Sequence, residues 1–364
     1  MKNLKFPALR IGDLLASLPI IQGGMGVGIS LSGLSSAVAN QGGIGVIAVA
    51  GIGMAEPDFF KNYMQANIRA LREEIQKARS MTKGIIGVNI MVALSNFGDY
   101  VATAIQEGVD IIFAGAGLPL NLPSYLSNNV KTKLVPIISS AKAANLLTRR
   151  WHEKYNYVPD ALVVEGPKAG GHLGFKPEQI TDPSFQLECL LTEVINETQH
   201  LEKKYGKAIP VIAAGGVYTG ADIRKYLELG AAGVQMATRF VATDECDADE
   251  AFKQTYLSSQ EKDITIIKSP VGLPGRAIKN SFLCEVEAGE KKPFSCPFHC
   301  IITCDYKNAP YCIASALIHA KKGDFSQGFA FSGSNAWRSK KIIPVKELIK
   351  NLRTEYEDSA KETT

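Results

Sequence analysis

The chain lacks the features that mark membrane and nucleic-acid-binding proteins. No apolar run in its 364 residues approaches the roughly 20 residues that a membrane-spanning helix needs. It also has no block of like charge, since 40 Lys and Arg residues oppose 36 Asp and Glu residues and leave a formal net charge of +4. A polyanion would need such a block. We therefore expect neither a membrane nor a nucleic-acid partner.

Signals for secretion are also missing. The N-terminal stretch is interrupted by Pro7, Asp13 and Pro19, and no small-residue cleavage site follows it. The 7 cysteines are an odd number, and a chain of this length does not need disulfides to stabilise a small core. These absences predict a cytoplasmic protein with reduced thiols.

Apolar residues are abundant and regularly spaced. They make up 46% of the chain, enough for one large core. Short runs rich in Val and Ile alternate with segments that carry helical patterns and caps. The runs are Pro19–Gly24, Gly45–Ala50, Ile85–Ile90, Asp110–Ala114, Leu134–Ser139, Ala161–Glu165, Pro210–Ala214 and Gly233–Met236. The helices expected between them are Ser32–Asn40, Pro57–Lys83, Phe97–Glu107, Leu122–Asn128, Ala141–Tyr155, Pro183–Tyr205 and Gly220–Leu229.

This eightfold alternation predicts an α/β fold, a (β/α)8 TIM barrel. The alternative, an open doubly wound sheet, would show one early glycine-rich fingerprint, whereas here glycines follow many of the strands. After residue 240 the pattern changes to an acidic stretch, a helix near Ala248–Ser258 and the Pro/Gly-rich segment Ser269–Arg276. We expect the barrel over residues 1–240, with a return segment over 313–356, and a small lid or cap over 241–312. Helices at Pro310–Lys322 and Pro344–Tyr356 would make the return.

Glycine-rich loops follow the last two predicted strands, in Ala213–Val217 and Gly233–Arg239. These are the positions at which barrels bind phosphate, because glycine lets backbone N–H groups approach the phosphate oxygens. The pattern predicts a phosphorylated ligand. The alternative is that these glycines only form tight turns.

A histidine stands on the same rim, in the segment Val164–Gly174 after the sixth strand. Gly170 and Gly171 precede His172 and Gly174 follows it, so the imidazole has no apolar helical face to pack on. Imidazole titrates near neutral pH and can transfer a proton or, as a cation, hold an anion. We predict that His172 lies at the centre of an active site, with a satisfied core histidine as the alternative.

Two further motifs close the rim, Gln22–Gly26 and Gly87–Met91. Met25 would offer backbone amides and a thioether to a planar ring, and Asn89 could both donate to and accept from the edge of a heterocycle. A buried Asn89 that hydrogen-bonds only to backbone is the alternative reading.

A cysteine cluster lies within the lid region. Cys296, Cys300 and Cys304 are spaced four residues apart and would share one stripe of a helix, and Cys312 follows. Four thiolates with His299 nearby could bind zinc or an iron–sulfur cluster. The alternative is reduced thiols packed under the lid.

The order of these motifs resembles the nitronate monooxygenase (2-nitropropane dioxygenase) family and the related flavin-dependent enoyl-acyl-carrier-protein reductase II. The resemblance implies FMN across the barrel mouth, with its phosphate on the last two loops, its ring near Met25 and Asn89, and His172 facing the substrate. Lys168 departs from the family pattern as we know it. The cofactor-binding residues implied are Gly24, Met25, Gly26, Asn89, Ser139, Glu165, Ala169, Gly170, Gly171, Gly215, Gly216, Gln235, Met236, Ala237 and Thr238.

The function that follows is the FMN-dependent oxidation of alkyl nitronates or nitroalkanes by O2 to carbonyl compounds and nitrite. The alternative is an NAD(P)H-dependent enoyl-acyl-carrier-protein reductase, in which FMN passes a hydride to an enoyl thioester. A third hypothesis is a non-catalytic flavin protein that senses redox state through its cysteines. In each case we expect a small-molecule substrate. The sequence is compatible with a homodimer but does not determine the oligomeric state.

Overall fold

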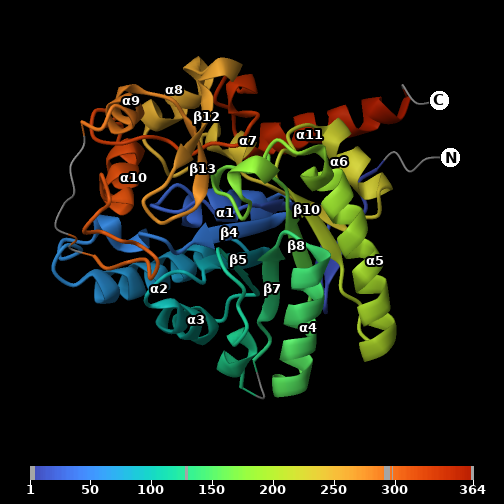
Figure 1. Cartoon of the computed structure of the whole chain (residues 1–364). Helices are drawn as coiled ribbons and strands as arrows, with labels where there is room; N and C mark the ends of the chain where they lie inside the picture. The colour runs from blue at the N-terminus through green and yellow to red at the C-terminus, as the bar shows by residue number, and fades with distance from the viewer. Residues whose placement is uncertain (1–4, 128–129, 291–295, 297, 362–364) are drawn as a thin grey trace.

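Parallel strands close into a barrel at the centre of the computed structural model, which describes residues 5–127, 130–290, 296 and 298–361 (Figure 1). The order around the closed barrel is β10-β11-β3-β4-β5-β6-β7-β8. The strands are β3 (Ile20–Gln22), β4 (Ile44–Ala48), β5 (Ile85–Met91), β6 (Ile111–Gly115), β7 (Lys133–Ile138), β8 (Leu162–Glu165), β10 (Val211–Ala214) and β11 (Gly233–Met236). The prediction of a (β/α)8 TIM barrel is therefore confirmed.

The barrel interior is filled by apolar side chains. Ile21, Val46, Phe113 and Val163 are all fully buried and belong to one cluster. A hairpin of β1 (Leu9–Ile11) and β2 (Leu14–Ala16) adds its own apolar residues to that cluster. Because this hairpin precedes the first barrel strand, it covers the amino-terminal end of the barrel and leaves the carboxyl ends of the strands for a site.

Helices surround the barrel and pack on the outer faces of its strands (Figure 1). Most begin and end within a few residues of the predicted positions, because the apolar periodicity marks their buried faces. They are α1 (Ser32–Asn40), α2 (Tyr63–Met81), α3 (Phe97–Gln106), α4 (Ala141–Tyr155), α5 (Leu187–Tyr205), α6 (Gly220–Glu228) and the short α7 (Thr238–Val241).

Two predicted helix starts are wrong. Residues 57–62 form turns before α2, because the Asp58 carbonyl accepts the N–H groups of Lys61 and Asn62 at 2.9 and 2.8 Å. Residues Pro183–Phe185 form a separate 3-10 turn capped by the Asp182 carboxylate, and α5 begins only at Leu187. In both places a local side chain or carbonyl satisfies N–H groups that a longer helix would have used.

The helix predicted at Leu122–Asn128 is also wrong. The structure has a 3-10 turn at Leu122–Tyr125 and irregular backbone after it, and Asn128 lies outside the described residues. Pro123 sits in the first turn, where its missing N–H is harmless, but four residues give too short a nucleus for an α-helix. The step from β6 to β7 therefore has no α-helix within residues 116–127 and 130–132.

The chain beyond residue 240 lies over the carboxyl ends of the strands (Figure 1). β12 (Ile264–Lys268) and β13 (Pro274–Ile278) form an antiparallel hairpin, and β13 also pairs with β9 (Gly171–His172). The helices here are α8 (Glu250–Ser258), α9 (Ser281–Glu287), α10 (Ile313–Lys321) and α11 (Val345–Lys361). The last of these returns to the barrel and packs against α6 and α1. The division into barrel and lid stays a prediction.

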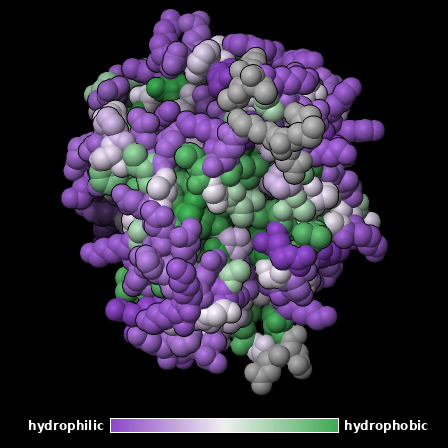
Figure 2. Space-filling model, turned by 90° about the vertical axis from the view of Figure 1, so that its right-hand side faces the viewer, coloured by the Kyte–Doolittle hydropathy of each residue, from purple (hydrophilic) through white to green (hydrophobic). Residues whose placement is uncertain are grey.

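Among the helices that the structure describes, none combines the length and apolar character needed to cross a bilayer. Figure 2 shows hydrophilic residues over most of one face, with hydrophobic residues gathered in its middle.

Candidate active site at the barrel mouth

His172 lies on β9, above the carboxyl end of the barrel. Its backbone pairs with Gly275 of β13, so the hairpin fixes the position of the residue. The imidazole Nε2 lies 2.7 Å from the Ser269 Oγ. Its ring also meets the Phe331 ring edge-to-face, with the ring centroids 4.9 Å apart. The imidazole is thus held from two sides by residues of the upper layer.

Burial changes the charge state of this histidine. Desolvation lowers the pKa of His172 from 6.5 to about 4, because a low-dielectric surrounding disfavours the imidazolium. The imidazole is therefore neutral at neutral pH. A neutral imidazole can accept a proton, but it cannot hold an anion by charge.

A carboxyl group lies at the end of β8, the barrel strand that precedes β9 in the chain. Glu165 ends β8, beside Ala214 of β10, and burial raises its pKa from 4.5 to about 7. Its side chain makes no hydrogen bond to another residue in the described part of the chain. The site therefore holds a base and an acid whose pKa values are shifted in opposite directions, a pattern found where protons are transferred.

The first of the two predicted phosphate loops adopts a backbone conformation that favours glycine. Gly215 and Gly216 have φ angles of 91° and 98°. A Cβ atom on Gly216 would lie only 2.9 Å from the Lys168 Cβ, so the lysine stem covers this glycine. Lys168 itself is exposed. Backbone N–H groups here remain open to an anion, and the Lys168 charge lies on the same rim.

The return segment closes over these loops. The Asn335 amide donates to the Gly216 carbonyl at 2.8 Å, and the Gly333 N–H donates to the Thr238 hydroxyl at 3.2 Å. Gly170 packs so closely on Ser332 and Gly333 that a Cβ atom would lie 2.6 Å from their backbone. Residues 332–335 therefore lie against both glycine-rich loops and against Gly170 at the barrel mouth.

The opposite wall is formed by the loop after β3. A Cβ atom on Gly24 would overlap the Asn89 side chain, so only glycine lets β3 and β5 approach so closely. The Met25 N–H donates to the Ser30 Oγ at 2.8 Å, and the Ser30 hydroxyl donates back to the Met25 carbonyl at 3.1 Å. Gly26 packs on Ala50. This loop is thus fixed without any ligand.

Polar side chains without partners point to a ligand between these walls. Within the described residues, the amides of Asn89 and Gln235 make no side-chain hydrogen bond, although both residues are half-buried. Half-buried polar groups normally find partners. The remaining predicted residues lie at the same end of the barrel: Ser139 after β7, Ala169, Gly170 and Gly171 between β8 and β9, Met236 at the end of β11, and Ala237 and Thr238 at the start of α7.

Comparison with known proteins identifies the family. The family model named "Nitronate monooxygenase" matches residues 10–355. The chain belongs to this family. A Mycobacterium tuberculosis (strain ATCC 25618 / H37Rv) relative, (3aS,4S,5R,7aS)-5-hydroxy-7a-methyl-1-oxo-octahydro-1H-indene-4-carboxyl-CoA dehydrogenase, is 30% identical over 75% of this chain and 66% of its own length. The "Probable nitronate monooxygenase" of Staphylococcus aureus (strain Newman) is 27% identical over 75% of this chain and 78% of its own.

Solved structures agree on the fold. FabK from Thermotoga maritima superposes with a TM-score of 0.73 at 28% identity, covering 95% of this chain and 94% of that one. A nitroalkane oxidase from Streptomyces ansochromogenes superposes with a TM-score of 0.71 at 22% identity, covering 95% and 98%. The chain spans 66% and 65% of the lengths of the first two curated relatives. The family and its relatives point to an oxidoreductase.

Two residues of this family member were missed by sequence reasoning. Ser269 contacts His172, and Arg276 of β13 donates from Nη1 to the carbonyls of Pro167 and Ala169 at 2.5 and 2.6 Å. Burial lowers the pKa of Arg276 to about 10, so the guanidinium stays charged at neutral pH. Both lie in the segment Ser269–Arg276, whose sequence indicates only a Pro/Gly-rich part of the lid. The polar side chains of Ser269 and Arg276 within this segment were the signal that could have revealed their roles.

The cysteine cluster is brought together, but not by a helix. Residues 298–302 do not form a helix: His299 has a left-handed φ of 45°, Ile301 pairs with Leu94, and the Ile302 N–H donates to the Ala93 carbonyl at 2.9 Å. The expected helical stripe is therefore wrong. Burial raises the pKa of the Cys300 thiol to about 12, with charge at Cys312 as the next cause. In the part of the chain that the structure describes, no three His, Cys, Asp or Glu side chains are placed to hold a single metal ion.

Proposed function

We propose that the chain is an FMN-dependent oxidoreductase that oxidises nitroalkanes or their nitronates with O2 to carbonyl compounds and nitrite. The observation that carries the proposal is the buried, neutral His172 on the same rim as the two glycine-rich loops. A base is what deprotonation of a carbon acid requires.

The residues at the barrel mouth fit FMN. Gly215 and Gly216 offer a backbone cradle for the phosphate, with the Lys168 charge on the same rim. The amides of Asn89 and Gln235, which lack partners within the described chain, could pair with the edge of the ring system. When bound, FMN would supply the electron chemistry that no side chain can perform. The protein would orient the substrate and move its proton.

His172 would take the α-proton of a nitroalkane at Nδ1, because Nε2 faces the Ser269 hydroxyl at 2.7 Å. In the neutral ring Nε2 would carry the hydrogen and donate it to Ser269, which leaves the lone pair of Nδ1 for the proton. The imidazolium that forms would keep the same bond from Nε2 to Ser269. Glu165, with a pKa of about 7, is placed at the end of β8 to exchange a proton with the same pocket near neutral pH.

A second candidate is a flavin oxidoreductase that acts on thioesters. The M. tuberculosis relative named as a carboxyl-CoA dehydrogenase is 30% identical over 75% of the chain. The exposed Lys168 on the rim would also suit a phosphate-bearing substrate. Reduction of an enoyl thioester by NAD(P)H belongs to this candidate. However, a histidine with a pKa of about 4 would be a poor proton donor to such a substrate at neutral pH.

Anaerobic reduction of the bound flavin tests the two candidates. Purified protein is mixed separately with propyl nitronate, NADH and NADPH, and the oxidised-flavin absorbance is followed. We expect bleaching by the nitronate alone, and nitrite release once air is admitted. Rapid bleaching by NADH or NADPH alone would favour the enoyl reductase, and protein without any flavin absorbance would reject both.

A further inference from the structure

Four cysteines gather around one cavity outside the barrel mouth. Cys296, Cys300, Cys304 and Cys312 line a cavity of about 240 Å³, together with His299 and Tyr306. All four are free thiols, and three of them come from one short loop. The proposed flavin chemistry uses none of them.

The cavity is larger than a single ion requires. A zinc ion holds four sulfurs at ~2.3 Å, which places them roughly 3.8 Å from one another. No three such side chains among the described residues are placed to hold one ion. A volume of about 240 Å³ is several times the ~30 Å³ share of one water molecule. The thiols thus surround room for a group of several atoms.

Backbone N–H groups already point at two of the sulfurs. The His299 N–H donates to the Cys296 Sγ at 3.2 Å, and the Ser315 N–H donates to the Cys312 Sγ at 3.5 Å. His299 adopts a left-handed conformation, with a φ of 45°, which is uncommon for a residue other than glycine. Such N–H···S bonds stabilise charge on sulfur and tune iron–sulfur centres.

Aromatic side chains pack against the inner side of the cluster. Phe298 contacts Phe59 and Tyr63, with both pairs of ring centroids 5.3 Å apart, and Cys300 is buried in the same apolar group. An apolar shell limits the access of water to a metal centre and sets its potential. The cluster thus has a protected side, which a set of surface thiols would lack.

We propose that Cys296, Cys300, Cys304 and Cys312 bind an iron–sulfur cluster through four thiolates. When a preformed cluster is transferred from a thiolate donor, four donor thiolates leave the iron as four Fe–S bonds to the cysteines form. Each departing thiolate takes up the proton that one cysteine releases, so the oxidation state of the iron does not change. The inference stands apart from the proposed function, because it uses neither His172 nor the flavin loops.

The loop that carries Cys296, Cys300 and Cys304 is hydrogen-bonded to the barrel rim and to the turn after β12, so a bound cluster would affect both. The Ser95 hydroxyl donates to the His299 carbonyl at 2.6 Å, which joins the loop to the barrel rim after β5. The Thr303 hydroxyl donates to the Val271 carbonyl at 3.2 Å, two residues from Ser269. A bound cluster would therefore order the loop that supports the turn carrying Ser269.

Metal and sulfide analysis of the full chain tests the proposal. Protein purified without oxygen, and a sample reconstituted with sulfide and equal amounts of ferrous and ferric iron, are assayed for iron, acid-labile sulfide and zinc. We expect iron and sulfide in equal amounts, about four of each per chain for a cubane cluster. A low-temperature EPR signal should appear on reduction with dithionite. Zinc in place of iron, or no iron after reconstitution, would overturn the proposal.

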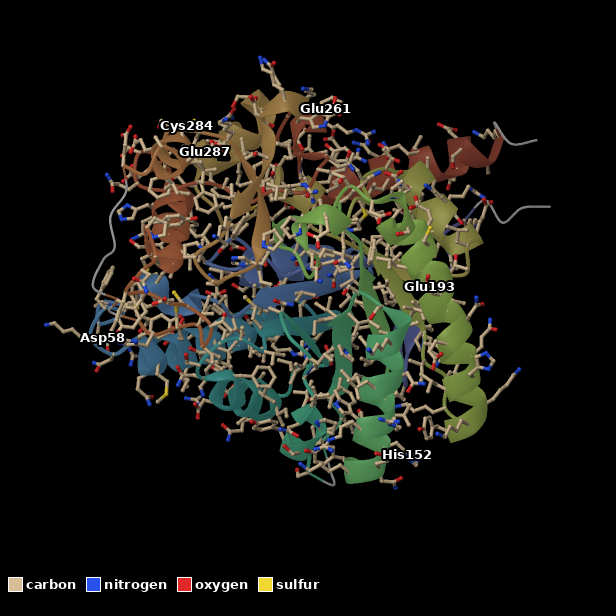
Figure 3. The ribbon with its side chains drawn as sticks, in the orientation of Figure 1. Asp58, His152, Glu193, Glu261, Cys284 and Glu287 are labelled. Carbon is tan, nitrogen blue, oxygen red and sulfur yellow. The ribbon has the colours of Figure 1, made fainter. Side chains whose placement is uncertain are left out.

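Cysteine variants separate this site from adventitious iron. Cys300→Ser and Cys304→Ser should each lose most of the iron and the EPR signal. Cys284→Ser and Cys189→Ser are matched controls, since both residues are exposed and lie outside the cavity, Cys284 on α9 (Figure 3). Equal loss in all four variants, or in none, would overturn the proposal. The analysis of the unsubstituted chain decides the question if a variant fails to fold.

Discussion

At the scale of single residues, the proposed reaction depends on His172 as the base. We expect His172→Ala to lower turnover of a neutral nitroalkane by about 10²- to 10⁴-fold, the usual contribution of a positioned base. Turnover of the corresponding nitronate should fall much less, because that substrate has already lost its proton. Steady-state rates with both forms of one nitroalkane, at matched flavin content, measure the difference. Equal losses for the two substrates would remove His172 from the role of base.

The pH dependence of the same reaction follows from the depressed pKa. His172 must be neutral to accept a proton, and its pKa is lowered to about 4. The kcat/KM for the nitroalkane should therefore show no loss from this group as pH falls through 6.5, and should decline only near pH 4. A profile measured between these values checks the assignment, and an acidic limb centred near 6.5 would contradict it.

A second residue-scale test concerns the phosphate cradle. Gly216→Ala puts a side chain at a φ of 98° and 2.9 Å from the Lys168 Cβ, a strain of about 1–3 kcal/mol. We expect purified Gly216→Ala to contain far less flavin than the unsubstituted protein. Gly206→Ala is the control, because Gly206 has a φ of 68° but nothing within 4 Å of its Cβ position. Both substitutions strain the backbone, and only the first should release flavin.

At the scale of elements, the β12–β13 hairpin holds the site from above. Arg276→Leu would leave the buried carbonyls of Pro167 and Ala169 without their donor. We expect a loss of about 2–3 kcal/mol in the free energy of unfolding, together with lower turnover, because the backbone of β9 pairs with this strand. Urea denaturation and turnover measure the two effects. Arg149→Leu, which removes only an exposed pair at 3.8 Å, should change neither.

The barrel strands could be predicted because their residues carry a local signal. A strand buried on both faces reads as a continuous Val and Ile run, as in Ile85–Met91 and Ile111–Gly115. The upper hairpin gives no such signal. β12 (Ile264–Lys268) is half-exposed, so it lacks the continuous apolar run of a buried strand. Its partner strand β13 begins with Pro274 and Gly275, which are rare in strands. β13 pairs with β9 through Gly275 and His172, and this contact between distant segments is one that no local pattern encodes.

The site was predictable to the same extent. Gly215, Gly216 and His172 follow barrel strands, so the topology alone places them on one rim. Ser269 and Arg276 reach that rim only through the hairpin, and the cysteines gather only because Ile301 pairs with Leu94. Contacts between distant segments depend on packing that a sequence pattern does not show. The residues that touch the reacting groups were therefore easier to name than those that support them.

At the scale of the whole molecule, the two shifted groups make opposite contributions to stability. Between pH 4.5 and 6.5, Glu165 is protonated in the folded chain and ionised in the unfolded one, since its pKa is raised from 4.5 to about 7. Its contribution is full below pH 4.5 and is lost as pH rises through 7. His172 is neutral in the folded chain and protonated in the unfolded one, since its pKa is lowered from 6.5 to about 4. Its contribution is full above pH 6.5 and is lost as pH falls through 4.

Single substitutions at Glu165 and His172 should therefore change the pH dependence of the free energy of unfolding in opposite directions. Each group changes the free energy of unfolding by up to about 1.4 kcal/mol per pH unit in this window, and in the unsubstituted protein the two slopes cancel. Relative to that protein, Glu165→Gln should gain stability as pH rises from 4.5 to 6.5, and His172→Asn should lose it. The measurement is urea denaturation of the flavin-free proteins at several pH values, since bound ligand would add its own linkage. The double variant should again follow the unsubstituted protein, because both groups are then absent. If the two single variants instead shared one slope, the opposite protonation states that the barrel mouth imposes on these residues would be wrong, and with them the assignment of His172 as the base.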